Sequence, residues 1–129
     1  MNRVYTFDLP VDHMERAKKF YEEVFGWEIA PIPGSGGNYH SAITVPSDEN
    51  GEPKIPGGIN GGFYQRGTHG LTGTFIEINV PSIDKYLKKV EEAGGKTVLP
   101  RGSISNLGFF AVVKDTEGNI IGLWEDVKE

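Results

Sequence analysis

Cysteine is absent from the 129-residue sequence, which excludes disulfide bonds, thiolate metal sites and cysteine nucleophiles. The chain also lacks a long apolar run and an apolar leader behind Met1, so we expect no membrane contact and a cytoplasmic location. Positive charge is sparse as well, because 13 basic residues are outnumbered by 18 acidic ones. The scattered lysines and arginines form no basic footprint, so we expect no nucleic-acid partner.

Glycine, by contrast, is abundant in this sequence. Its 18 residues fall in short clusters between patterned segments and form no repeat, which indicates turns and places of close backbone approach. Hydrophobic residues make up 37% and charged residues 24% of the chain, as in an ordinary folded protein, and the length fits one domain. We therefore expect a single domain that covers residues 1–129.

The first half of the chain predicts a strand, a helix and three further strands. Apolar and polar residues alternate from position 3 to position 11, as in a half-buried strand. Asp12 is the expected N-cap of the following helix, because Glu15 comes three residues later, and Gly26 is its expected end. Three strands are then predicted at residues 27–32, 39–45 and 57–64.

The second half repeats this order of elements. A strand at 74–80 precedes a helix that Ser82 caps and that the Gly94–Gly95 pair ends. The remaining strands are predicted at residues 96–99, 108–114 and 120–125, and a hairpin turn joins the last two. The halves align at an offset of 69 residues, which is the spacing between Gly26 and Gly95, so an internal duplication is the simplest explanation.

Segments at both ends of the chain resemble a known family. Residues 7–12, the helix motifs within 15–27 and the closing turn and strand at 115–125 resemble the vicinal oxygen chelate superfamily, which includes glyoxalase I, bleomycin-resistance proteins and extradiol dioxygenases. The resemblance implies an α+β, glyoxalase-like fold of two βαβββ modules in tandem, at 1–65 and 70–129, whose curved mixed sheets surround a cavity. It also implies a homodimer that binds a small-molecule ligand.

Metal-dependent members of this superfamily hold a divalent ion at four inward-facing positions. The resemblance carries these positions onto Thr6, onto Gly61 or Gly62, onto Phe75 and onto Gly122. A catalytic divalent ion needs about three N or O ligands from side chains, and this set offers a single hydroxyl. We therefore expect no metal and no other cofactor in this protein.

Two carboxylates, Asp8 and Glu77, are related by the same offset of 69 residues. Strand alternation places Asp8 with Thr6 and Glu77 with Phe75, so a twofold arrangement of the modules would put both carboxylates in the cavity. Two nearby carboxylates raise each other's proton affinity and can act as general acid and base or bind a cation. The alternative is that both are ordinary polar residues on a wet concave surface.

The remaining cavity candidates are one histidine and several aromatic residues. His40 lies on a predicted strand and is expected either to contact a ligand or to be a hydrogen-bonded structural residue. Phe63, Tyr64, Phe75, Phe110 and Trp124 are expected to pack mainly in the core, with one or two lining the cavity. The full set of cavity candidates is Thr6, Asp8, His40, Gly62, Phe75, Glu77, Phe110, Gly122 and Trp124.

Three functions remain open from the sequence. The first is a metal-free small-molecule binding protein, like the antibiotic-sequestering relatives, for a cationic or hydrogen-bond-donating ligand. The second is a lyase, isomerase or dioxygenase of the glyoxalase I type, which would use a divalent metal or the Asp8 and Glu77 carboxylates. The third is an interaction module without a small ligand, which a filled cavity would support. Whether the protein is an enzyme is not decided by the sequence.

Overall fold

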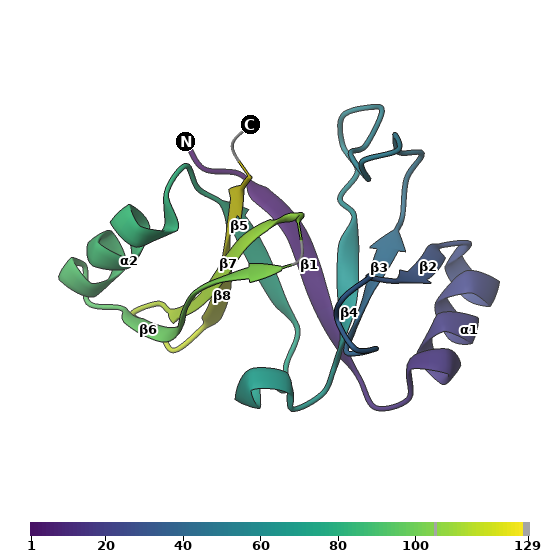
Figure 1. Cartoon of the computed structure of the whole chain (residues 1–129), viewed down its shortest axis with the longest axis horizontal. Helices are drawn as coiled ribbons and strands as arrows, with labels where there is room; N and C mark the ends of the chain where they lie inside the picture. The colour runs from purple at the N-terminus through teal and green to yellow at the C-terminus, as the bar shows by residue number, and fades with distance from the viewer. Residues whose placement is uncertain (105, 128–129) are drawn as a thin grey trace. The chain divides into compact units, whose positions relative to one another are not determined.

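The computed structural model describes residues 1–104 and 106–127. Within them, the order strand, helix, three strands occurs twice, as Figure 1 shows. The first set consists of β1 (Val4–Val11), α1 (Met14–Phe25), β2 (Glu28–Pro31), β3 (Tyr39–Ile43) and β4 (Gly61–Gln65). The second set consists of β5 (Phe75–Asn79), α2 (Ile83–Glu92), β6 (Lys96–Ile104), β7 (Gly108–Lys114) and β8 (Ile120–Asp126). The predicted α+β class with two βαβββ modules is therefore confirmed.

The chain divides into two compact units, one formed by Thr6–Thr74 and the other by Met1–Tyr5 with the residues from Phe75 onward. The first residues are tied to the second module by hydrogen bonds. The backbone N–H of Asn79 donates to the Arg3 carbonyl at 3.0 Å, and the Tyr86 hydroxyl donates to Asn2 Oδ1 at 3.1 Å. β1 thus contributes its first two residues to the second unit, which the sequence pattern did not indicate.

The sheet of the first unit has the strand order β2-β3-β4-β1. β1 and β4 run parallel, with Leu9 opposite Phe63, while the other neighbouring strands are antiparallel. One face of this sheet packs against α1 because apolar residues recur at alternate strand positions and at helical spacing. The core on that face contains Val11, Ile29, Ala42 and Phe63, with Leu9, Tyr21 and Trp27 among the side chains packed against it.

α1 begins one residue later than the capping pattern predicted. Its N-cap is His13, which makes no side-chain capping bond, so the prediction of Asp12 as N-cap is wrong. The Asp12 carboxylate instead accepts a hydrogen bond from Arg66 Nε at 2.8 Å, a contact between residues far apart in sequence. The predicted end is confirmed, because Gly26 adopts a left-handed conformation with φ of 71° and its N–H returns to the last turn.

Asn60 organises the connection between β3 and β4. Its side chain accepts a hydrogen bond from the Thr44 N–H at 2.8 Å and donates to Ser47 Oγ at 2.8 Å and to the Gly51 carbonyl at 3.0 Å. Because this buried amide is committed to the loop, β4 begins at Gly61, later than the predicted strand.

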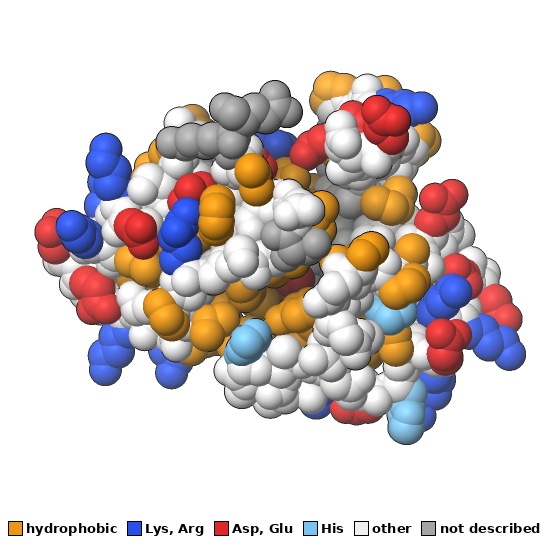
Figure 2. All heavy atoms as spheres, viewed as in Figure 1, with side chains coloured by type: hydrophobic (Ala, Val, Ile, Leu, Met, Phe, Trp, Pro, Cys, Tyr) orange, Lys and Arg blue, Asp and Glu red, His pale blue; other side chains and the backbone are white. Residues whose placement is uncertain are grey.

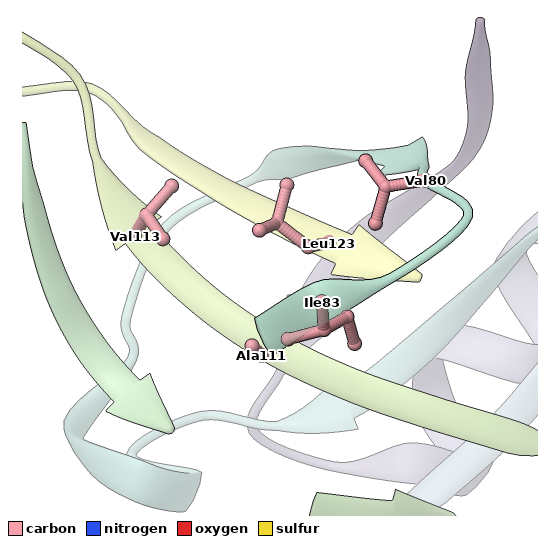
Figure 3. Close-up of a cluster of buried hydrophobic side chains, with 5 residues drawn as sticks. All are labelled: Val80, Ile83, Ala111, Val113 and Leu123. Carbon is pink, nitrogen blue, oxygen red and sulfur yellow. The ribbon is translucent and has the colours of Figure 1, made fainter. Parts of the chain in front are cut away.

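The second unit has the strand order β5-β8-β7-β6, with β5 and β8 parallel. Its helix begins as predicted, because Ser82 Oγ accepts a hydrogen bond from the Lys85 N–H. Ile83, at the start of α2, is fully buried, and burial of such a side chain contributes about 1.5–3 kcal/mol. Figure 3 shows this core cluster, which joins α2 to β7 and β8 and consists of Val80, Ile83, Ala111, Val113 and Leu123.

β6 is longer than the sequence predicted, because it continues past Pro100 to Ile104. β6 forms the edge of its sheet, where a proline removes no ladder hydrogen bond if its position faces outward. The register with β7 shifts between Leu99 and Gly102, so an irregularity accommodates the ring. The prediction that this strand ends at residue 99 is therefore wrong.

Charged side chains of both signs are interspersed on the face that Figure 2 shows, including the region of α2 at the left. Among the described residues, no helix has the length and apolar character needed to cross a membrane.

Candidate functional site

Each sheet has a face that packs on the helix of its own unit and a second face, called the distal face here. In the first unit, Leu9 packs in the α1 core, so the neighbouring positions Thr6, Asp8 and Pro10 of β1 point to the distal face. Register pairs Asp8 with Gly62 on β4, which therefore belongs to the same face. The structure thus brings together the predicted residues Asp8 and Gly62 within this unit.

The Asp8 side chain leans toward Gly62. A Cβ atom on Gly62 would lie 3.5 Å from Asp8 Oδ1 and 3.2 Å from the His40 carbonyl oxygen, so a larger residue would crowd this carboxylate. Asp8 is only 9% exposed, and its partner on β4 is Gly62, which has no side chain. The absence of a side chain at Gly62 thus leaves space for the Asp8 carboxylate on the distal face.

Tyr64 completes this group, since Pro10 pairs with it in the β1–β4 register. Burial and then the Asp8 carboxylate raise the pKa of Tyr64, and the Arg66 guanidinium opposes them by lowering it. The phenol therefore stays protonated at neutral pH and donates a hydrogen bond to the Gly73 carbonyl at 2.5 Å. The sequence analysis considered Tyr64 only as an aromatic residue of the core or cavity. Tyr64 lies two positions after Gly62 on the same strand, which indicates that both are on the distal face.

His40 lies on the other face of the same sheet. It is directly opposite Phe63 in the β3–β4 register, and Phe63 packs in the α1 core. His40 is 9% exposed, and within the described part of the chain its Nδ1 atom has no hydrogen-bond partner. The histidine is therefore on the side of the sheet away from Asp8, and its contact with a ligand stays a prediction.

The distal face of the second unit carries the other carboxylate. Ile78 packs in the α2 core, so Phe75 and Glu77, on alternate positions of β5, point away from α2. The register places Glu77 opposite Gly122 of β8. On its other side, β8 pairs with β7, where Val112 is opposite Gly122. Phe110 lies two positions before Val112 on β7 and therefore on the same face.

Gly122 is the centre of this second group. A Cβ atom at Gly122 would lie 2.6 Å from Glu77 Cγ, 3.2 Å from Phe75 Cε2 and 3.4 Å from Phe110 Cε2. The stem of Glu77 therefore lies where a side chain of residue 122 would be, and the Phe75 and Phe110 rings reach to the same place. Glu77 is 8%, Phe75 6% and Phe110 7% exposed. Four predicted site residues are thus in contact within one unit.

Trp124 is the next residue on the distal side of β8. Its indole stacks on the Tyr5 ring with a centroid distance of 6.0 Å, and its Nε1 donates to Asp126 Oδ1 at 3.0 Å. Gly108 provides the room for this indole, because a Cβ there would lie 2.4 Å from Trp124 Cζ2. Sequence reasoning did not find Tyr5, which carries no motif and reaches Trp124 only through the pairing of distant segments.

A separate surface hollow of about 450 Å³ lies in the second unit, near the ends of β5 and β8. Arg3, Asn79 and Asp126 are among the residues that line it. Predicted site residues do not line this hollow, and the Asn79 amide is already bonded to the Trp124 carbonyl and to Asp126. We therefore place a candidate site on the distal face of each unit.

The positions that the resemblance assigns to a metal do not offer a suitable donor set. The Phe75 side chain has no donor atom, Gly62 and Gly122 have no side chain, and Thr6 supplies one neutral hydroxyl. The space beside Gly122 is taken by the Glu77 stem, so a ligating side chain has no room there. Across residues 1–104 and 106–127, the structure contains no group of three or more His, Asp or Glu side chains arranged to hold an ion. These residues do not fit a catalytic divalent metal.

Comparison with known proteins identifies the family. The model of the Glyoxalase/Bleomycin resistance protein/Dioxygenase superfamily matches residues 3–123. The chain belongs to this superfamily. The expectation from the sequence is confirmed on this point, because the superfamily is the one that the terminal motifs resemble.

Individual relatives are similar to this chain at moderate or low identity. A Mycobacterium tuberculosis protein named "Putative glyoxylase CFP32" is 31% identical over 126 residues, which are 92% of this chain and 43% of that protein. The chain therefore spans less than half the length of this relative. A methylmalonyl-CoA epimerase variant from Streptomyces coelicolor, solved with 2-nitronate-propionyl-CoA, is 11% identical with a TM-score of 0.69, covering 99% of both chains.

A third similar structure is the Mn(II)-bound glyoxalase from Novosphingobium aromaticivorans. It is 17% identical with a TM-score of 0.64, over 98% of this chain and 40% of that one. At these low identities the two structural similarities establish the fold and leave the chemistry open.

Proposed function

We propose that this superfamily member is a small-molecule binding protein that recognises its ligand with buried carboxylates and aromatic rings and holds no resident divalent metal. The observation that carries the proposal is the group around Gly122, where the Glu77 stem and two phenyl rings occupy the space of a side chain. In the other unit, the Asp8 carboxylate beside Gly62 is buried as well.

The chemistry of these groups favours binding of a cationic or hydrogen-bond-donating ligand. A carboxylate in its ionised form only accepts hydrogen bonds, so it pairs with ammonium, guanidinium or N–H groups. Phenyl and indole faces add apolar contact area and attract cations through their quadrupole. The distal-face residues Phe75, Phe110 and Trp124 supply such surfaces in the unit that holds Glu77.

The first experiment measures metal content and ligand binding on the same preparation. Protein purified without chelator is examined by inductively coupled plasma mass spectrometry, and we expect substoichiometric Zn, Ni, Mn and Fe. Thermal unfolding is then followed with a panel of cationic, neutral and anionic aromatic compounds that includes metal-free bleomycin. A ligand that binds the native state raises Tm, so a rise with members of the panel supports the proposal. One equivalent of tightly bound metal, or no rise with the whole panel, contradicts it.

An enzyme of the glyoxalase I type is the second candidate function. The observation in its favour is the buried Glu77 carboxylate in apolar surroundings, an environment in which general bases are often found. The similarity to a Mn(II)-bound glyoxalase and to an epimerase adds to it. Turnover of a hemithioacetal that is lost with EDTA and restored by nickel or zinc would establish a metal-dependent enzyme. Turnover that persists in EDTA and is abolished by Glu77→Gln would establish a carboxylate-dependent one.

We further propose that the protein is a cytoplasmic homodimer without a nucleic-acid or membrane partner. Support comes from the superfamily membership, from the acidic net charge and from the scattered lysines and arginines. Light scattering coupled to size exclusion tests the assembly, with twice the mass of the 14.2 kDa chain as the expected result. A monomer mass at micromolar concentration would contradict this part of the proposal.

A further inference from the structure

The apolar side of α1 is only partly covered within its own unit. Phe20, Val24 and Phe25 are 53%, 56% and 58% exposed, and we call these three residues the α1 patch. The ring centroids of Phe20 and Phe25 lie 6.3 Å apart, so the exposed groups adjoin one another. α1, which the structure describes in full, has no buried residue. A contiguous exposed apolar patch is a common mark of an interaction surface.

Charged residues of opposite sign lie on either side of Phe20 along the helix. Arg16 comes four residues before Phe20 and Glu23 three residues after it, so the three positions share one face of α1. Within the described part of the chain, Arg16 takes part in no ion pair. The contact of Glu23 with Lys19 is long, at 4.0 Å, and both side chains are exposed. Arg16 and Glu23 can therefore both pair with charges on another molecule.

This face of α1 is complementary to itself when two copies of the helix pack antiparallel. A twofold axis near Phe20 brings the two Phe20 rings together and places Arg16 opposite the partner's Glu23, once on each side of the axis. A parallel arrangement would place like charges opposite each other, which disfavours association. The charge pattern therefore specifies both the partner and its direction.

We propose that the α1 patch is the homodimer interface and that α1 of a second copy, in antiparallel orientation, covers it. The inference rests on the proposed homodimer and names its contact surface. A lipid surface is a poorer match, because α1 carries three acidic and three basic residues. Helices that bind membranes are instead rich in lysine and arginine on their polar face.

The size of the patch indicates how sensitive such a dimer is to substitution. Two phenylalanines and a valine at this exposure present roughly 300 Å² of apolar surface. A standard interface buries about 800 Å² on each partner, so the proposed contact is a small one. The affinity of a small interface depends on a few side chains, and we expect Phe20 at the axis to be the most important of them.

Sedimentation equilibrium of the full chain, from low micromolar to near-millimolar concentration, tests the interface. Wild type should reach twice the mass of the 14.2 kDa chain. Phe20→Glu places two carboxylates at the axis and should raise the dimer Kd by about tenfold or more. Ile55→Glu is the matched control, because Ile55 is a 60% exposed apolar residue of the same unit outside α1. This control should leave the dimer Kd unchanged.

Charge reversal tests the antiparallel direction. Arg16→Glu and Glu23→Arg each place like charges opposite each other, so each variant should dimerise more weakly than wild type. The double variant restores opposite charges across the interface and should recover most of the wild-type affinity. A loss of helix stability alone would not be reversed in this way, so recovery shows that the two residues meet.

The outcomes separate this inference from the proposed homodimer. A wild type that is monomeric at every concentration contradicts both, and its flotation with phosphatidylcholine–phosphatidylglycerol vesicles would assign the α1 patch to a membrane. If Phe20→Glu dimerises as tightly as wild type, the inference fails while the homodimer stands. A double variant that recovers no affinity overturns the antiparallel pairing. Far-UV circular dichroism confirms folding, and the charge reversals decide the question should Phe20→Glu not fold.

Discussion

At the scale of single residues, glycines in this protein serve two different physical needs. Some adopt left-handed backbone conformations, as Gly26 does where α1 ends. Others have ordinary conformations and are needed because a neighbouring group approaches closely, as at Gly61 and Gly122. The second kind determines where large side chains can lie, on the α1 side of the first sheet at Gly61 and on the distal face of the second sheet at Gly122.

Gly61→Ala should destabilise the protein strongly, because its Cβ would lie 2.5 Å from the Phe7 carbonyl oxygen and 2.6 Å from the Phe7 ring. Overpacking against backbone costs about 1–3 kcal/mol of unfolding free energy. Gly102→Ala is the matched control, since a Cβ there meets nothing within 4 Å. Urea denaturation should show a loss for the first variant and a change of less than about 1 kcal/mol for the second. Equal stabilities would contradict the close contact with Phe7.

Asp115 should make the stability of the β7–β8 hairpin depend on pH. Its carboxylate accepts hydrogen bonds from the Asn119 side chain and backbone and from the Glu117 N–H, and these bonds, with those of Asn119 largest, lower the pKa of Asp115. Because the folded-state pKa is the lower one, the contribution is complete above the unfolded pKa of about 4 and is lost as pH falls through the folded value.

The measurement compares wild type with Asp115→Asn in urea from neutral pH down to acid pH. Wild type should be the more stable near pH 7, and the difference should shrink as pH falls below the ordinary range of aspartate, about 4. Asn119→Ala removes one of the donors to Asp115, so this variant should be less stable than wild type at pH 7, and this difference should also shrink as pH falls. A difference that is constant with pH would show that the charge of Asp115 does not stabilise the turn.

At the scale of elements, the two helices differ in how deeply they are embedded. α2 begins with the fully buried Ile83, whereas α1 has no buried residue and leaves Phe20, Val24 and Phe25 more than half exposed. The aromatic residues of α1 contact one another, for example Phe20 and Tyr21 with a ring-centroid distance of 5.1 Å. The energetic contribution of a helix to its unit therefore depends on a few side chains and not on its length.

Ile83→Ala should cost about 2–5 kcal/mol of unfolding free energy, because it removes a side chain from the centre of the α2 core cluster and leaves a cavity. Val24→Ala on α1 is the control, at a side chain that is 56% exposed, and should change stability by less than about 1 kcal/mol. Chemical denaturation of both variants measures the contrast. Similar losses at the two positions would contradict the difference in embedding.

At the scale of the whole molecule, the compact units do not coincide with a simple cut of the chain. The first five residues belong to the unit of the second module, and the connection after β4 is held to the first unit through Arg66 and Tyr64. Arg66 Nη1 donates to the Thr72 carbonyl at 2.7 Å in addition to its contact with Asp12. The segment that joins the modules is therefore an ordered part of the first unit.

The stability of the whole protein should be independent of divalent metal ions. We expect the same Tm in EDTA as in buffer, and no increase on adding zinc, nickel or manganese, because the assigned positions lack a suitable donor set. A metal present at 100 times its Kd would add about 2.7 kcal/mol, which corresponds to a rise of several degrees. Scanning calorimetry with and without each ion makes the test, and a rise of that size would contradict our reading of the site.

The sequence alone determined the order of the elements, the end of α1 at Gly26, the Ser82 cap, the β7–β8 hairpin and the superfamily. These features depend on local signals, such as alternation, helical spacing, caps and turns, that act within a few residues. Strand alternation also indicated the correct relation of Glu77 to Phe75 on β5.

Only the tertiary structure decided which residues of different strands are in contact. It placed His40 opposite Phe63 on the α1 side of the sheet. Asp12 accepts a hydrogen bond from Arg66 and does not cap the helix. The Glu77 stem lies where a side chain of residue 122 would be. Each of these contacts depends on the register between strands or on segments far apart in sequence. Register is set by long-range pairing and by packing of the whole face, so a local pattern cannot specify it.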